Sequence, residues 1–223
     1  RLAHRALLDG REHEVVEAVS EAYEIHGSGD SSLPHSIFLR FPEAPANRII
    51  ALPAYLGGDY DIAGLKWVAS FPANLERGMD RASAILILNS ARTGRPEAII
   101  EGSLISAQRT AAGAALAART LLDGEPVNAV GMIGCGPINL TVAQFLFHVR
   151  PEIRQLTVYD TQPSRAEYFV QKCRQSFGTV NVSIADEIET VLQRHTLISF
   201  ATTASEPHVK DLSACRPGSV ILH

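Results

Sequence analysis

The sequence is poor in the residues that mark several protein classes. Its 223 residues include only three cysteines, which stand far apart, and no Cys-x-x-Cys pair. This usage indicates neither a disulfide framework nor a zinc site, so we expect no bound metal and a reduced, cytoplasmic setting. No apolar run reaches the roughly 18 residues of a membrane span, and the first residues lack a signal segment. We therefore expect no membrane partner.

Basic residues are not in excess either. Lys and Arg total 20 against 24 for Asp and Glu, and no basic block occurs, which disfavours nucleic acid as a partner. Hydrophobic residues make up 46% and charged residues 20%, which is a globular composition and excludes a disordered chain. The chain begins at Arg1 without methionine and stops at His223 inside an apolar run. We therefore expect a fragment that is truncated at its C-terminus.

The first half of the chain predicts an α+β domain. Residues 12–26 carry an apolar stripe at helical spacing, and Gly27 follows as a C-cap before a loop rich in glycine and serine. Short β-type runs are expected at Ser36–Phe41, Arg48–Leu52, Gly64–Ser70 and Ala84–Leu88. A further helix is expected from the N-cap Ser103 to about Leu122.

The second half alternates β and α segments. Strands are expected at Val127–Ile133, Leu156–Tyr159, Val180–Ile184, Leu197–Ala201 and Ser219–Leu222. Helices are expected at 137–149, Ser164–Ser176 and Asp186–Arg194. This alternation predicts an α/β fold with a Rossmann-like doubly wound parallel sheet. We place the domain boundary so that residues 1–122 form the first domain and residues 123–223 the second.

A turn with two glycines joins the first of these strands to its helix. Gly134 would permit the tight turn, and Gly136 would let the backbone approach a pyrophosphate. The helix that begins with Pro137 and Ile138 would offer that charge free N–H groups and a positive dipole end. Asp160 ends the next strand, where a carboxylate can bond the ribose hydroxyls of NAD and repel the 2′-phosphate of NADP. The pattern predicts an NAD site, and its alternative is a structural turn that binds nothing.

Four further residues bear on the predicted NAD site. Thr202 and Thr203 follow a strand where doubly wound sheets line the cofactor crevice, although an ordinary loop explains them as well. Asn139 stands where the dinucleotide fingerprint has Gly or Ala, which implies a slightly wider approach of helix and strand. Cys135 lies at a helix N-terminus, which lowers the pKa of a thiol, but no histidine stands near it in sequence. We interpret it as a packing residue.

Two cations stand in apolar surroundings of the first domain. Lys66 lies inside an apolar strand, where burying an unpaired charge is expensive, and strand alternation places Leu65 and Trp67 on the opposite face. Arg109 lies on a helix of small residues and has the fork that binds a carboxylate. The alternatives are a snorkelling edge-strand residue for Lys66 and a solvated helix face for Arg109.

Several strings resemble the ornithine cyclodeaminase/mu-crystallin family. They are Leu52-Pro-Ala-Tyr-Leu-Gly-Gly, Gly64-Leu-Lys, Phe71-Pro-Ala-Asn, Ser106-Ala-Gln-Arg-Thr-Ala-Ala, Ile133-Gly-Cys-Gly and Ala201-Thr-Thr-Ala-Ser-Glu-Pro. Within the family, Arg48-Ile-Ile-Ala-Leu-Pro and Met79-Asp-Arg-Ala-Ser-Ala resemble the branch of 2,3-diaminopropionate-forming dehydrogenases. These enzymes serve siderophore and peptide-antibiotic biosynthesis. The resemblance implies a substrate and dimerisation domain before the Rossmann domain, and a homodimer.

The resemblance also implies a reaction. NAD would oxidise N-(2-amino-2-carboxyethyl)-L-glutamate at Cα, and water would release 2,3-diaminopropionate and 2-oxoglutarate. A small amino-acid substrate with three carboxylates needs several cations, and five are available: Arg40, Arg48, Lys66, Arg81 and Arg109. By this resemblance Lys66 and Arg109 are the catalytic pair. Lys66 would hold a carboxylate and polarise the water or imine, and Arg109 would clamp a carboxylate.

The sequence departs from the family in two places. Pro34-His35 stands where ornithine-type enzymes carry Pro-Arg, so Arg40 would take that role, and His35 is either a site residue or structural. The family's catalytic Asp would lie beyond His223. The alternatives are an ornithine cyclodeaminase or cyclic imino-acid reductase and, in another class, a non-catalytic crystallin-like protein that binds NAD(P). The branch-specific strings count against the first, and Lys66 with Arg109 against the second.

Overall fold

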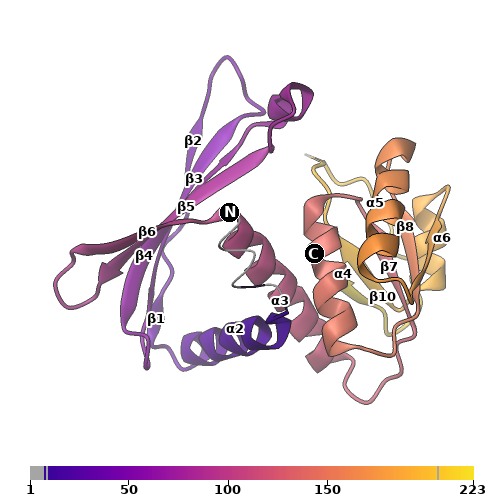
Figure 1. The fold of residues 1–223 in the computed structure, drawn as a ribbon, viewed down its shortest axis with the longest axis horizontal. Helices are drawn as coiled ribbons and strands as arrows, with labels where there is room; N and C mark the ends of the chain where they lie inside the picture. Colours follow the sequence, from indigo (N-terminus) through magenta and orange to yellow (C-terminus); the bar gives the residue numbers. More distant parts are fainter. Residues whose placement is uncertain (1–7, 9, 205) are drawn as a thin grey trace. The chain divides into compact units, whose positions relative to one another are not determined.

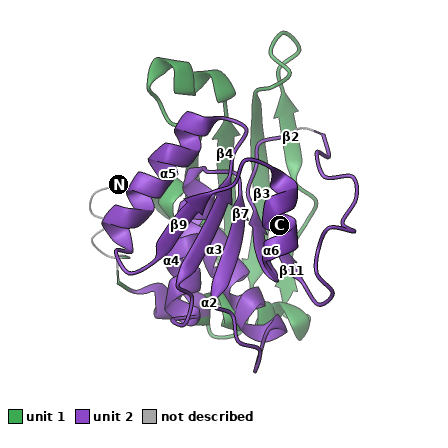
Figure 2. Cartoon of the chain, turned by 90° about the vertical axis from the view of Figure 1, so that its right-hand side faces the viewer, with its two compact units in different colours: residues 1–10, 17–106 green, residues 11–16, 107–223 purple. Residues whose placement is uncertain are grey.

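The computed structural model describes residue 8 and the ranges 10–204 and 206–223 (Figure 1). The chain forms two compact units, which Figure 2 shows in different colours. Unit 1 comprises residues 1–10 and 17–106, and unit 2 comprises residues 11–16 and 107–223. These compact units divide within helices, whereas the functional domain boundary at residue 122 stays a prediction.

Unit 1 is built on an antiparallel sheet in the order β1-β3-β4-β5-β6, with β2 paired to β3. Its strands are β1 (Ser31–Ser32), β2 (Ile37–Arg40), β3 (Arg48–Leu56), β4 (Ile62–Ser70), β5 (Ala82–Ser90) and β6 (Pro96–Glu101). The helix α2 (Glu12–Gly27) precedes them, and the 3-10 helix η1 (Pro72–Arg77) joins β4 to β5. The central strands are long and regular, since β3, β4 and β5 pair over nine residues each.

The prediction of an α+β first half is confirmed, with corrections. The stretch of Gly and Ser expected to be a loop contains β1, because Ser31 and Ser32 pair with the end of β3. The strand β6 was not predicted, because its first residues, Pro96 and Glu97, are poor strand formers. Gly27 lies within α2 and does not follow it.

Unit 2 is built on a parallel sheet in the order β11-β10-β7-β8-β9. Its strands are β7 (Ala129–Ile133), β8 (Gln155–Tyr159), β9 (Asn181–Ile184), β10 (Leu197–Phe200) and β11 (Val220–Leu222). Its helices are α4 (Pro137–Val149), α5 (Pro163–Ser176) and α6 (Ile188–Arg194), and α3 (Ser103–Leu121) leads into it. The predicted doubly wound sheet is confirmed, and its strand order reverses between β7 and β10.

The hydrophobic core of unit 2 lies against the parallel sheet. The helix α6 packs on β7 and β8, α5 on β9 and α4 on β10. One cluster of buried side chains joins α6 to the strands: Ile133, Ala185, Val191, Leu192 and Ile198. Both faces of the sheet are covered, as continuous apolar strands require. Within the described ranges, no helix is both long and apolar enough to cross a membrane.

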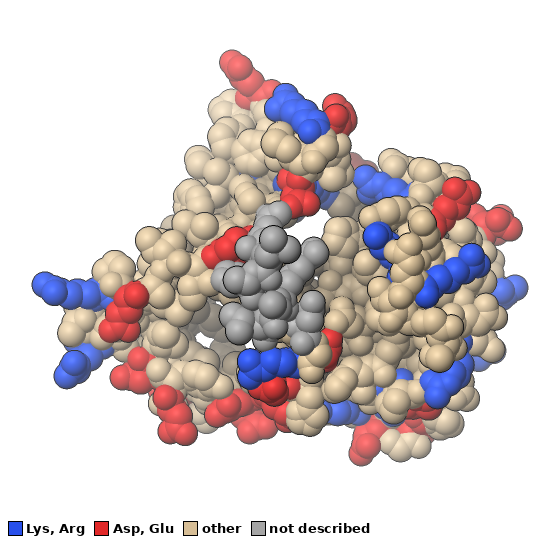
Figure 3. All heavy atoms as spheres, viewed as in Figure 1, with Lys and Arg blue, Asp and Glu red and all other residues tan. Residues whose placement is uncertain are grey.

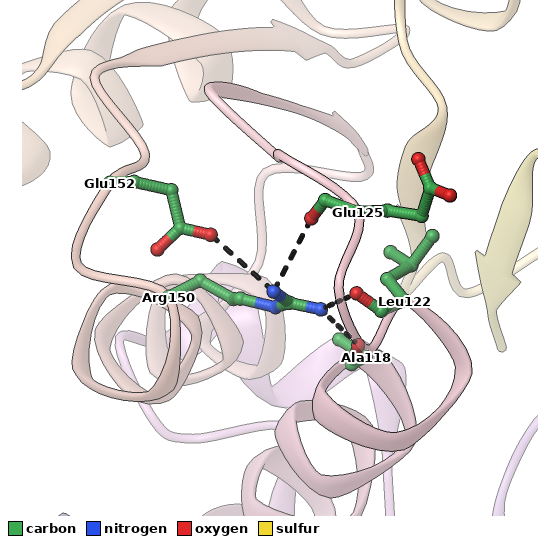
Figure 4. A network of polar contacts seen from close by, with 5 residues as sticks. All are labelled: Ala118, Leu122, Glu125, Arg150 and Glu152. Carbon is green, nitrogen blue, oxygen red and sulfur yellow. Dashed lines mark hydrogen bonds and ion pairs between the residues drawn. The ribbon is translucent and has the colours of Figure 1, made fainter.

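A half-buried arginine caps the end of α3 (Figure 4). Arg150, just after α4, donates from Nη2 to the carbonyl oxygens of Ala118 and Leu122 and from Nη1 to that of Glu125. The last carbonyl groups of a helix have no partner within it, and a cation also favours the negative end of the helix dipole. Arg150 therefore closes α3 and ties it to α4.

Candidate active site

The turn between β7 and α4 requires glycine at its first position. Gly134 has φ +94°, and a Cβ atom there would lie 2.4 Å from the carbonyl oxygen of Ala201. Gly136 is the N-cap of α4, and a Cβ atom there would meet no heavy atom within 4 Å. The first glycine is thus needed for the fold, and the second keeps the backbone open on its outer side.

The first turn of α4 offers hydrogen-bond donors outward. Gly136 has no side chain to cap the helix, and Pro137 has no N–H to satisfy. The N–H groups of Ile138 and Asn139 belong to the turn that lacks intrahelical acceptors, and the positive end of the dipole lies there. This arrangement fits a phosphate group.

Asp160 lies directly beside this turn. Its Oδ2 accepts a hydrogen bond from the Cys135 N–H at 2.8 Å, and its Oδ1 accepts one from the Gln162 N–H at 2.9 Å. The side chain is half-buried, and each carboxylate oxygen keeps a further acceptor site. The carboxylate therefore stands fixed at the end of β8 and fits the hydroxyl groups of a ribose.

Asn139 is the residue whose importance the sequence did not reveal. Its side chain is fully buried, and Nδ2 donates to the carbonyl oxygens of Ile133 at 3.0 Å and Gly134 at 2.7 Å. Its Oδ1 accepts a hydrogen bond from the Ser199 hydroxyl at 2.7 Å. The amide thus joins β7, the glycine turn and β10. Its position in the fingerprint was the only sequence signal, because Ser199 lies 60 residues away.

The segment after β10 also reaches the glycine turn. The Ala201 N–H donates to the Ile133 carbonyl oxygen at 3.0 Å, and Thr202 Cγ2 lies 3.2 Å from where a Cβ of Gly134 would stand. Thr202 is therefore beside the turn, as predicted for a residue lining the crevice. Thr203 is exposed, and its role stays a prediction.

Cys135 is buried, and its pKa is raised to about 12 by burial and by the Asp160 carboxylate. The helix end does not outweigh these two effects, so the thiol stays protonated at neutral pH. This state supports the packing role expected from the sequence. The described cysteines are all free thiols. The described residues also contain no group of three or more His, Cys, Asp or Glu arranged to hold a metal ion.

In unit 1, Lys66 lies at the middle of the antiparallel sheet. The strand β4 has β3 and β5 as neighbours, so the edge-strand alternative for Lys66 is wrong. The side chain is half-buried and donates from Nζ to the Ser106 hydroxyl at 3.2 Å. Leu65 and Trp67 alternate with it in the strand and therefore point to the other face.

Two arginines share the face of Lys66. Arg40 pairs with Arg48 across β2 and β3, and Arg48 pairs with Ser70 on β4, four residues from Lys66. Side chains two or four residues apart in a strand share a face, so Arg40 and Arg48 lie on the face of Lys66, offset from it by about 13 Å in the direction of the strands. The Nε of Arg48 is buried without a hydrogen-bond partner among the described residues. Such a donor fits a carboxylate.

The remaining predicted residues are more dispersed. Arg81 donates from Nε to the Ser70 hydroxyl at 3.2 Å, which places it at the Arg48 end of the same sheet. Arg109 is exposed on α3 and belongs to unit 2, and both interpretations of it stay open. His35 is exposed in the loop before β2. The face of the molecule drawn in Figure 3 carries acidic and basic side chains interspersed.

The fold and these sites define a class: a Rossmann-type α/β protein with an added antiparallel-sheet unit. The sequence profile of the ornithine cyclodeaminase/mu-crystallin family matches residues 7–222. The chain belongs to the ornithine cyclodeaminase/mu-crystallin family.

Known proteins similar to this chain include dehydrogenases and reductases. The N-((2S)-2-amino-2-carboxyethyl)-L-glutamate dehydrogenase of Staphylococcus aureus is 32% identical over 87% of this chain and 59% of its own length. The Δ1-pyrroline-2-carboxylate reductase of Thermococcus litoralis, solved with NADH and L-proline, is 28% identical with a TM-score of 0.87, over 97% of this chain and 66% of that one. An archaeal alanine dehydrogenase dimer with bound NAD is 30% identical to this chain, with a TM-score of 0.81, and the match covers 94% of this chain and 62% of the other.

These relatives are longer than this chain. The chain spans 59% of the Staphylococcus aureus enzyme and 63% of an alanine dehydrogenase from Archaeoglobus fulgidus.

Proposed function

We propose that the protein is an NAD-dependent dehydrogenase of an amino-acid substrate. The observation that carries the proposal is the Gly134–Gly136 turn, which opens the first turn of α4 and lies against the fixed carboxylate of Asp160. A phosphate-binding helix end beside a ribose-binding acid is the arrangement that dinucleotides require. Two similar solved structures contain NADH and NAD, respectively, and this supports the same cofactor here.

The proposed reaction is the oxidative cleavage of N-(2-amino-2-carboxyethyl)-L-glutamate to 2,3-diaminopropionate and 2-oxoglutarate, as a step of siderophore or peptide-antibiotic biosynthesis. The similarity to the Staphylococcus aureus enzyme supports this substrate. The cations of unit 1 support it as well. Arg40, Arg48 and Lys66 share one face of the sheet, and a substrate with three carboxylates needs several such groups.

In the proposed mechanism, bound NAD would supply the acceptor for a hydride from the substrate Cα, and water would hydrolyse the resulting substrate imine. Gly134, Gly136 and the N–H groups of the first turn of α4 would hold the pyrophosphate, and Asp160 the ribose. Lys66 would bind a carboxylate and polarise the water or the imine, with Ser106 accepting one of its protons in a hydrogen bond. Arg109 would clamp a second carboxylate.

The test mixes the protein with NAD and the glutamate conjugate and follows the NADH absorbance band. We expect NADH to appear in proportion to 2-oxoglutarate. A Lys66→Met variant is the matched negative control for contaminating activity. No NADH with the conjugate but turnover of ornithine would overturn the proposed substrate and favour the ornithine cyclodeaminase alternative.

A second candidate is reduction of a cyclic imino acid. The fold match to the Thermococcus litoralis reductase, with a TM-score of 0.87, favours it. This reaction runs in the opposite direction, so it predicts loss of NADH when Δ1-pyrroline-2-carboxylate is added. Running both assays on one preparation separates the two candidates.

We further propose that the protein is a cytoplasmic homodimer. Apolar side chains are exposed on the sheet face opposite Lys66. Ile37 pairs with Ala51, Ala51 with Trp67 and Trp67 with Ile85, so these side chains form a row across four strands. Trp67 is 38% and Ile85 41% exposed. An exposed apolar face of this kind favours a protein partner, and the similar alanine dehydrogenase is a dimer.

A further inference from the structure

A single peptide group in the glycine turn is held from both of its edges. The peptide between Gly134 and Cys135 accepts at its carbonyl oxygen a 2.7 Å hydrogen bond from Asn139 Nδ2. The same peptide donates through the Cys135 N–H to Asp160 Oδ2 at 2.8 Å. A peptide group is planar, so fixing its carbonyl fixes the direction of its N–H. Asn139 and Asp160 are therefore linked through one rigid group.

The orientation of the Asn139 amide is determined by its partners. Its two neighbours Ile133 and Gly134 present carbonyl oxygens, which only the NH2 end of the amide can face. The Ser199 hydroxyl then meets the amide oxygen. Since Asn139 is 0% and Ser199 2% exposed, water does not compete for these bonds.

We propose that the Asn139 side chain is a positioning group for the dinucleotide and sets the selectivity between NAD and NADP without itself touching either. The inference rests on the proposed function, because it assigns Asp160 to the ribose. With Asn139 in place, the Cys135 N–H holds one oxygen of the Asp160 carboxylate, and the charge stands at a fixed point. Without Asn139, the Gly134 carbonyl is released, the peptide rotates and the carboxylate loses this anchor.

This arrangement replaces the small residue that the dinucleotide fingerprint has at the same position. A Gly or Ala there allows helix and strand to pack closely. Here an amide fills the space and bonds to β7 and β10. The side chain of Ser199 on β10 is small and supplies the hydroxyl, so the two residues act as a pair.

The test measures binding of NADH and NADPH by nicotinamide fluorescence. We expect Asn139→Ala to raise the Kd for NADH about tenfold and that for NADPH about threefold or less, which narrows the selectivity. Ser199→Ala leaves the donors of Asn139 in place and should raise the Kd for NADH about threefold.

A destabilised control separates positioning from loss of stability. Ile153 is 2% exposed and precedes β8, about 16 Å along the strand from its carboxyl end, so Ile153→Ala weakens the same unit far from the turn. We expect Ile153→Ala to keep both dissociation constants. If Ile153→Ala lost as much selectivity for NADH over NADPH as Asn139→Ala, the proposal would be overturned. It would also be overturned if Asn139→Ala bound both dinucleotides as the wild type does.

Hydrogen exchange of the free protein provides a readout that needs no ligand. The Cys135 amide should exchange faster in Asn139→Ala than in Ile153→Ala at equal global stability. Unchanged exchange would show that Asn139 does not hold the peptide and would overturn the inference, while NADH binding by the wild type would still support the proposed function. A wild type that binds neither dinucleotide would overturn the proposed function itself, and with it the positioning role.

Discussion

Arg150 Nη2 donates a hydrogen bond to the Ala118 carbonyl oxygen at 3.2 Å, from the end of α4 to the last turn of α3. Its guanidinium also reaches the carbonyl groups of Leu122 and Glu125, so Arg150→Met removes three charge-assisted hydrogen bonds to part-buried or exposed carbonyl groups. We expect this variant to lower the free energy of unfolding by about 2 kcal/mol in urea titrations.

The matched control for that prediction is Arg154→Met. Among the residues that the structure describes, the Arg154 guanidinium donates to carbonyl groups of its own turn, those of Pro151 and Ile153. We expect a loss below about 1 kcal/mol, because these carbonyl groups remain near solvent. Equal losses of unfolding free energy in the two variants would show that capping of α3 by Arg150 adds no stability beyond that of an ordinary arginine.

His195 predicts a pH dependence of stability. The ring is 4% exposed, and neither ring nitrogen has a hydrogen-bond partner among the described residues. Burial, and then the charges of Arg194 and Arg216, lower the pKa of His195 to about 4, against 6.5 for a free histidine. Because the folded state binds this proton less well than the unfolded state, the stability is present above pH 6.5 and is lost as the pH falls from 6.5 to 4.

The measurement compares urea unfolding at about pH 7 and about pH 5, where we expect a loss of about 2 kcal/mol from this residue. In His195→Leu the neutral side chain removes this contribution, and the slope between the two pH values should be shallower. If the variant retains the wild-type slope, other groups cause it.

Asp160→Ala tests the cofactor assignment. Removing the carboxylate should raise the Kd for NADH about tenfold and bring it closer to that for NADPH, whose 2′-phosphate no longer meets a negative charge. Glu167→Ala, which removes an exposed carboxylate of α5, is the control for net charge. Unchanged selectivity in Asp160→Ala would remove this residue from the site.

Lys66→Met tests the substrate site and keeps most of the apolar stem. We expect kcat/KM for the glutamate conjugate to fall on the order of 100-fold, because a charged donor is lost at the reacting groups. NADH binding should be unchanged, since the proposed role of Lys66 is toward the substrate and not toward the dinucleotide. Ser106→Ala, which removes the hydroxyl that accepts a hydrogen bond from Nζ, should have a smaller effect. Full activity of Lys66→Met would contradict the assignment.

Ile85→Lys tests the proposed dimer. A charge placed on the exposed apolar face opposite Lys66 should shift the protein from dimer to monomer in sedimentation experiments. Tyr168→Lys, at an exposed position of α5 in unit 2, provides a control that should leave the dimer intact. A monomeric wild type would contradict the proposed dimer. An Ile85→Lys dimer of unchanged stability would contradict the proposed interface.

The sequence predicts the fold well wherever the signals are local. Helix α4 begins at Pro137 and ends at Val149 as expected, because proline at the first turn and the apolar period both lie within the helix. The short strand β1 was missed because Ser31 and Ser32 become a strand only by pairing with distant residues of β3. Such pairing leaves no pattern in the strand itself.

The candidate site divides in the same way. Gly134 and Asp160 are predictable, because a turn between strand and helix and an acid at a strand end have sequence signatures. The bonds of Asn139 to Ser199 and of Lys66 to Ser106 are not, because each joins residues that only the folded chain brings together. The sequence identified the groups that carry charge, and the fold supplied those that orient them.

The bond between Asp160 and the Cys135 N–H constrains how the proposed preference for NAD could change in evolution. Replacing the acid by a neutral or basic residue would admit a 2′-phosphate, but it would also take away the acceptor of a backbone N–H that lies in the phosphate-binding turn. A successful switch would need a second substitution that supplies another acceptor. We therefore expect single substitutions at this position to produce poor enzymes with both coenzymes. The proposed preference for NAD over NADP would then be difficult to change by one substitution.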